Sequence, residues 1–278
     1  MLTRVVVVAL AAGVLSGPAA ASSQPWKKVT VTRHAGSVTA MMSIKRQSRG
    51  QGFYNFRSLR LLVRAGGKTI VDQGLCGSER CSIGSHHTLT LENVTGGPLK
   101  EAVVSLYTGG AHCCFESAVA LVDGPHRGRV LVHNWGDPGY EGHWHDGVYD
   151  FITADDRFAY AFTSFAASGL PMLVLTIDPA GHFADVTSTR LDLVKADAKQ
   201  WWKAYLAERG KPDGEVRGVL AAWCADEYRL GEKPTCITEL ANALKKGWLH
   251  GPGGDIWPQS AKYVAALQRS LAKWGYTG

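Results

Sequence analysis

The spacing of apolar residues changes once along this chain, near residue 190, and that change limits the folds open to it. Between residues 29 and 189, apolar and polar side chains alternate, or β-branched residues form short runs such as 38–44 and 172–177. Alternation of this kind places every second side chain on one face of a strand. Turn segments such as 65–67 and 178–181 separate the runs, which is typical of antiparallel hairpins.

After residue 190 the spacing becomes helical. In the segment 195–209, Trp201, Trp202 and Tyr205 fall on one side of a helix, and we expect them to belong to its buried face. Further apolar stripes, each ending near a glycine as helices commonly do, lie in 216–228, 237–244 and 263–274. The sequence therefore predicts an α+β fold, in which an antiparallel β-rich N-terminal region is followed by a small C-terminal helical bundle.

The first residues have the parts of a secretory signal peptide. Arg4 precedes an apolar run over 5–15, and the small residues 19–21 follow. The run is shorter than the roughly 20 residues that span a bilayer. We expect residues 1–21 to be the signal peptide, 22–190 the β-rich domain and 191–278 the helical C-terminal region. The mature protein is expected to be secreted, extracellular or cell-wall associated, without a transmembrane segment.

The cysteines fit an exported protein. Disulfides persist in oxidising compartments, so the six cysteines predict three disulfides. Spacing favours pairs that are close in sequence: Cys76 with Cys81, Cys113 with its neighbour Cys114, and Cys224 with Cys236. In the alternative, Cys113 or Cys114 reaches Cys76 or Cys81.

Charge is unevenly distributed. The chain has a formal net charge of +6, yet residues 22–71 contain no acid, and Arg157 is the only Lys or Arg in 134–189. A basic face attracts anionic polymers, although the two segments could instead lie against each other and neutralise. We do not expect nucleic acid to be a partner.

Polar and aromatic residues are densest in the segments 107–116 and 133–146. Flat aromatic rings beside directional hydrogen-bonding groups suit a polar ligand or a protein hot spot. We therefore expect a binding module for an extracellular glycan, cell-wall polymer or protein, with no cofactor. The predicted ligand-binding residues are Tyr107, His112, Trp135, Tyr140, His143, Trp144 and His145.

Two other functions stay open, although a non-enzymatic role is favoured. An extracellular hydrolase could use Asp155, Asp156 and His112, but neighbours on a strand face opposite ways. A metal site could use His143 and His145, which point the same way on a strand, with Asp146. A solvated polar loop explains the same residues. An inhibitory or structural secreted protein is the remaining class.

Parts of the chain resemble a group of uncharacterised secreted bacterial proteins related to FG-GAP, or VCBS, repeats of the integrin-alpha N-terminal type. The matching segments are 101–114, 155–169, 223–231 and 274–276. In those repeats an acidic loop binds calcium, whereas here the segments 92–98 and 145–147 have lost most of the acids. The resemblance therefore implies an extracellular binding module without the calcium sites. With this resemblance, the expected form of the β-rich region is either a sandwich or a partial propeller.

Overall fold

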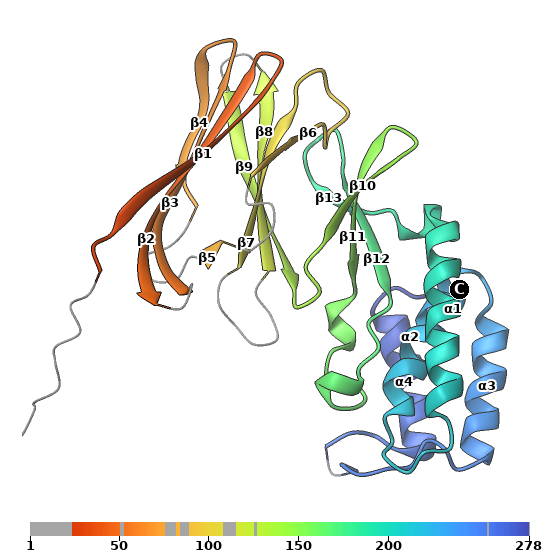
Figure 1. Cartoon of the computed structure of the whole chain (residues 1–278). Coiled ribbons are helices and arrows are strands. Elements are labelled where there is room, and N and C mark those ends of the chain that lie inside the picture. The colour runs from red at the N-terminus through yellow and green to blue at the C-terminus, as the bar shows by residue number, and fades with distance from the viewer. Residues whose placement is uncertain are drawn as a thin grey trace, which may run out of the picture.

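The computed structural model describes residues 24–50, 53–75, 82–83, 89–107, 115–124, 127–254 and 256–277. Within these residues, three antiparallel sheets precede four α-helices (Figure 1). The predicted α+β fold, with its helices in the C-terminal part, is confirmed. The proposed signal peptide, His112 and four cysteines lie outside the described residues; these cysteines are Cys76, Cys81, Cys113 and Cys114.

The first sheet is a meander in which each strand pairs with the next. Its buried face follows from strict alternation, because Ala40, Met42 and Ile44 point inward while the residues between them are more exposed. Leu61 pairs with Met42 across the register and continues this face. The strands are β1 (Lys27–Ala35), β2 (Val38–Gly50), β3 (Phe53–Ala65) and β4 (Lys68–Gly74).

The middle sheet is covered on both faces. On its central strand, Ala102 and Val104 pack toward the first sheet, while Val103 packs toward the third. A strand buried on both sides needs no alternation, which explains why 102–104 is a continuous apolar run. The strands are β5 (Ser82–Ile83), β6 (Thr90–Glu92), β7 (Glu101–Tyr107), β8 (Phe115–Gly124) and β9 (Arg127–Gly136).

The third sheet meets the middle sheet through an aromatic core. Trp135 of the middle sheet stacks on Phe151 with ring centroids 5.4 Å apart, and Phe183 and Leu175 complete the layer. Figure 1 shows the three sheets side by side, in the order in which the chain forms them. The strands are β10 (Glu141–His145), β11 (Val148–Ala154), β12 (Met172–Ile177) and β13 (Phe183–Asp185).

This layering keeps the basic and acidic segments apart. The basic segment lies in the first sheet, most of the acidic segment lies in and beside the third, and the middle sheet packs between them. The expectation that the two segments lie against each other is therefore wrong. Asp150, a buried acid of the third sheet, pairs with Arg190 instead, which donates to both carboxylate oxygens at 2.5 and 2.9 Å.

The helical unit has its own core. It consists of α1 (Leu191–Glu208), α2 (Val216–Arg229), α3 (Lys233–Lys245) and α4 (Ser260–Lys273). Tyr205, Leu220, Leu240 and Leu267 are buried together, as the helical stripes predict.

The segment between β11 and β12 joins the helical core. It forms two short 3-10 helices, η1 (Asp156–Phe158) and η2 (Phe165–Ala167). Phe158 and Phe162 both enter the helical core. A side chain at Gly218 of α2 would lie 2.0 Å from the Ala167 carbonyl oxygen, so this glycine lets α2 approach the segment closely.

The predicted disulfide between Cys224 and Cys236 is present, with Cα atoms 5.1 Å apart. It joins α2 to α3, since one cysteine lies on each helix. Among the described helices, none is both long and apolar enough to cross a membrane.

Candidate functional site

A cavity of about 470 Å³ opens where strand ends of the middle and third sheets meet. We call it the central cavity. It lies beside the ends of β7 and β8, which flank the segment 108–114, and beside the start of β10 and the end of β11. Its lining is Ser105, Leu106, Phe115, Glu116, Pro138, Gly139, Tyr140, Glu141, Ile152, Thr153 and Ala154.

Tyr140 connects the two sheets at this cavity. Its hydroxyl lies 3.1 Å from the Ser105 hydroxyl on β7, and its ring centroid lies 4.7 Å from that of Trp135. Burial raises the pKa of Tyr140 above its usual range, so the phenol stays neutral. The Thr153 hydroxyl donates to the Gly139 carbonyl at 2.5 Å and fixes the loop before Tyr140. One wall of the cavity is thus held rigidly in place.

The rest of the wall combines an accessible aromatic ring with acids. Phe115 is 37% exposed, and its ring packs against Tyr107 at a centroid distance of 5.1 Å. Glu116 and Glu141 also line the cavity. Carboxylates accept hydrogen bonds, so the wall offers an apolar face next to strong acceptors.

The predicted ligand-binding residues are only partly brought together. Tyr140 lines the central cavity and Tyr107 supports Phe115 at its edge. Trp135 is 3% exposed and donates its indole hydrogen to Ser117 Oγ at 3.0 Å, so it supports Tyr140 from the core rather than presenting a free ring. His112 belongs to the undescribed segment between β7 and β8.

The other predicted residues lie on β10, an edge strand that pairs with β11. Trp144 is 45% exposed and packs edge-on against Tyr149. His143 and His145 share the opposite face of β10, as alternation requires. These three side chains are neighbours of Glu141 along the strand, but they do not line the central cavity.

The alternative metal ligands do not converge. Among the described residues, the one group of three acids or histidines with ligand atoms in mutual reach is Glu208, Asp213 and Glu215. His145 Nε2 lies 3.5 Å from Asp146 Oδ2, while His143 is not part of any such group.

The two aspartates of the alternative catalytic site border one pocket but make different contacts. Asp155 is 2% exposed and accepts hydrogen bonds from Arg157 Nε at 2.7 Å and from the Tyr276 hydroxyl at 2.8 Å. These bonds tie the third sheet to the end of the chain, which gives Asp155 a structural role.

Asp156 and Asp155 both border a pocket of about 360 Å³, together with His133. Burial raises the pKa of Asp156 and lowers that of His133. A side chain at Gly136 would lie 2.4 Å from Asp156 Oδ2, so this carboxylate packs directly on the backbone of β9. The strand geometry expected for these two neighbours does not hold, because Asp156 begins the 3-10 helix η1 and both aspartates border the same pocket.

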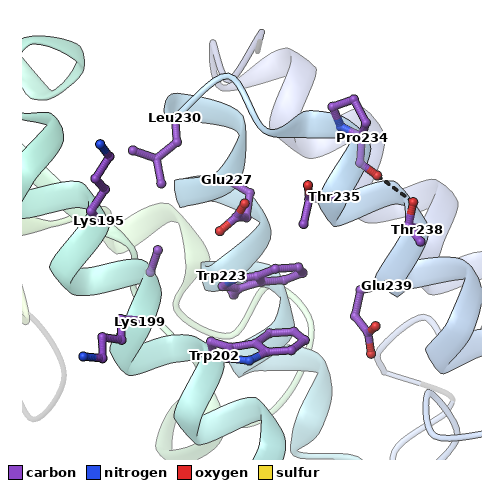
Figure 2. A pocket seen from close by; sticks show the side chains of 11 residues that line it. Lys195, Lys199, Trp202, Trp223, Glu227, Leu230, Pro234, Thr235, Thr238 and Glu239 are labelled. Carbon is purple, nitrogen blue, oxygen red and sulfur yellow. Dashed lines mark hydrogen bonds between the residues drawn. The ribbon is translucent and has the colours of Figure 1, made fainter.

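A third cavity, of about 710 Å³, lies in the helical unit and is larger than the two above. We call it the helical groove. Figure 2 shows Trp202 and Trp223 one above the other at its base, between α1 and α3, with their ring planes tilted by 40°. Sequence analysis assigned both tryptophans to the core; Trp223 is buried there, whereas Trp202 is partly exposed. Lys195 and Lys199, on the same helical face as Trp202, were the sequence signal that part of this side of α1 is accessible.

Comparison with known proteins gives one distant relative. The chain is 29% identical over 152 residues to a probable thylakoid lumen protein of Synechocystis sp.. The match covers 49% of this chain and 41% of that protein, so the chain spans less than half of its relative's length. No family model matches the chain, and no solved structure matches it.

Proposed function

We propose that this is an exported binding protein that recognises a neutral glycan at the central cavity. The observation that carries the proposal is the lining of the cavity, which combines Phe115, 37% exposed, with the acids Glu116 and Glu141. A volume of about 470 Å³ is within the range of small-molecule sites, roughly 300–1,000 Å³.

The chemistry of the wall favours sugars over the other ligands considered. The apolar face of a sugar ring packs on an aromatic side chain, and its hydroxyls donate to carboxylates. Two acids in the wall repel anionic polymers, so cell-wall phosphate and nucleic acid are disfavoured. Tyr107, at the end of β7, would add a contact beside Phe115.

Three observations support the export of this protein from the cytoplasm. Residues 1–21 have the composition of a signal peptide, and Cys224 and Cys236 form a disulfide, which is typical of oxidising compartments. The relative from Synechocystis is described as a lumenal protein, which is a location outside the cytoplasm. We infer that this chain also works outside the cytoplasm.

The sheet arrangement supports the relation to FG-GAP repeats. Each sheet is built mainly from consecutive strands, and successive sheets pack face to face. Blades of a propeller are antiparallel sheets formed in the same way. We therefore propose that the three sheets correspond to blade-like units, with the central cavity between the second and third.

A binding panel tests the function. Neutral oligosaccharides of the cellulose, chitin and starch series and an acidic series, polygalacturonate fragments, would be titrated calorimetrically into the mature protein. We expect binding to a neutral series, with a loss of at least about tenfold in Phe115→Ala and Glu116→Gln, equivalent to ~1.4 kcal/mol.

The matched control is Glu208→Gln, which removes one acid from α1 far along the chain from the cavity. It should bind like the wild type. Preferential binding of the acidic series, with no effect of the two cavity variants, would contradict the proposal and would move the site to the basic first sheet.

A further inference from the structure

The helical groove is a second site that the glycan proposal does not use. Residues of α1, α2 and α3 form its walls. Its volume of about 710 Å³ suits a small organic molecule. The lining is Lys195, Ala198, Lys199, Trp202, Trp223, Glu227, Leu230, Pro234, Thr235, Thr238 and Glu239.

The base of the groove is aromatic. The rings of Trp202 and Trp223 have centroids 4.7 Å apart, and in Figure 2 they lie one above the other below Glu227. Trp223 is buried and Trp202 is partly exposed. The electron-rich faces of indole rings attract organic cations, most strongly where water is excluded.

The acidic groups face this aromatic base. Glu227 projects between α1 and α3 above the tryptophans (Figure 2). Glu239 already accepts hydrogen bonds from the Tyr205 hydroxyl and the Asn242 amide. Burial raises the pKa of Glu227, with Glu232 acting in the same direction and a hydrogen bond from Trp223 opposing it. A bound cation would relieve this partly buried carboxylate.

The two lysines do not cancel this attraction. Lys195 and Lys199 are exposed, and in Figure 2 their ammonium groups point away from the tryptophan pair, so that mainly their hydrocarbon stems line the wall. Exposed charges are screened by water and salt, whereas Glu227 is half-buried. The interior of the groove therefore favours positive charge.

The spacing of two of the walls is fixed covalently. The disulfide between Cys224 and Cys236 joins α2 to α3 immediately after the lining residues Trp223 and Thr235. A preformed cavity binds its ligand without first ordering the helices, which improves affinity.

We propose that the helical groove binds an organic ammonium ion with an aromatic or aliphatic body. The ammonium group pairs with Glu227, and the body packs against Trp202, Trp223 and Leu230. Charge and aromatic lining both select this class over neutral and anionic molecules of the same size.

Three size-matched probes test the inference calorimetrically: phenethylammonium, phenethyl alcohol and phenylacetate. We expect the cation to bind at least about tenfold more tightly than the alcohol, ~1.4 kcal/mol, and phenylacetate to bind most weakly. Glu227→Gln should reduce binding of the cation to the level of the alcohol, whose own affinity should not change. Trp202→Ala should weaken both.

Glu208→Gln, with the same change of charge on α1 outside the groove, should bind all three probes like the wild type. Phe115→Ala should also leave them unchanged, which separates this site from the central cavity. Tightest binding of phenylacetate, unaltered cation binding in Glu227→Gln, or no binding of the cation would each overturn the proposal, whatever the outcome for glycans.

Discussion

Asp226 gives a quantitative test of how the helical unit is built. It lies on α2 with 0% exposure, and among the described residues no donor reaches either of its side-chain oxygens. Across from it on α1, Asp197 Oδ2 accepts hydrogen bonds from the Met172 backbone at 2.8 Å and from Trp201 Nε1 at 3.0 Å. Asp197 thus has two hydrogen-bond donors, while Asp226 has none to stabilise a charge.

Burial, followed by the neighbouring Asp197, raises the pKa of Asp226 from 3.8 to about 10. Folding therefore keeps a proton on Asp226, which can donate to Asp197. Because the pKa is raised in the folded state, this contribution to stability is complete below the unfolded value. It is lost steadily as the pH rises toward the folded value.

The size of the pH effect on the free energy of unfolding follows from the binding of one proton at Asp226. Between the two pKa values the folded chain binds one more proton at Asp226 than the unfolded chain, so its free energy of unfolding falls by about 1.4 kcal/mol per pH unit. In Asp226→Asn the amide can donate to Asp197 without titrating. From about pH 5 to about pH 8, the wild type should lose about 4 kcal/mol relative to this variant.

Urea unfolding of both proteins across that pH range, followed by circular dichroism with the disulfide intact, measures the difference directly. Taking the difference removes the contributions of all other titrating groups. Asp192→Asn, an exposed position on α1, should show no such trend. A constant difference between wild type and Asp226→Asn across the range would refute the reasoning.

Three further predictions concern stability and processing. Replacing Cys224 and Cys236 together by alanine should lower the free energy of unfolding by about 3 kcal/mol, the chain-entropy value for a short loop; unchanged urea melts would contradict this. Arg190→Ala leaves the buried Asp150 carboxylate unpaired and should lower the free energy of unfolding by about 3–5 kcal/mol. Arg33→Ala, at an exposed position of β1, should lower it little. N-terminal sequencing of the exported protein should begin at Ser22, and a retained Met1 would contradict cleavage after Ala21.

Periodicity was enough to predict the strand and helix regions, because burial of one face leaves a direct trace in the sequence. Val38, Ala40 and Met42 alternate since β2 has one buried face, and the glycine-terminated stripes became α1–α4. The order of the sheets left no such trace. The continuous apolar run 102–104 indicates a strand buried on both faces, but not which sheets cover it.

The candidate site was harder to predict, because composition does not distinguish a core aromatic from an accessible one. Trp135 and Tyr140 lie in the same segment. The indole N–H of Trp135 donates to Ser117 within the core, whereas Tyr140 lines the cavity. Phe115 was not predicted as a ligand-binding residue, since its exposure depends on how the loop at Gly139 packs beside it. The shape of the helical groove depends on how α1, α2 and α3 pack around Trp202 and Trp223, which spacing alone does not show.

The most direct test of the central claim is to locate the residues that respond to a bound neutral glycan. Hydrogen–deuterium exchange of the mature protein would be compared with and without the tightest-binding neutral oligosaccharide of the panel. The account predicts slower exchange in β7, at the start of β8 and around Tyr140 and Glu141, with β1–β4 unchanged. Protection confined to the basic strands β1–β3, or no protection with any neutral oligosaccharide, would contradict it.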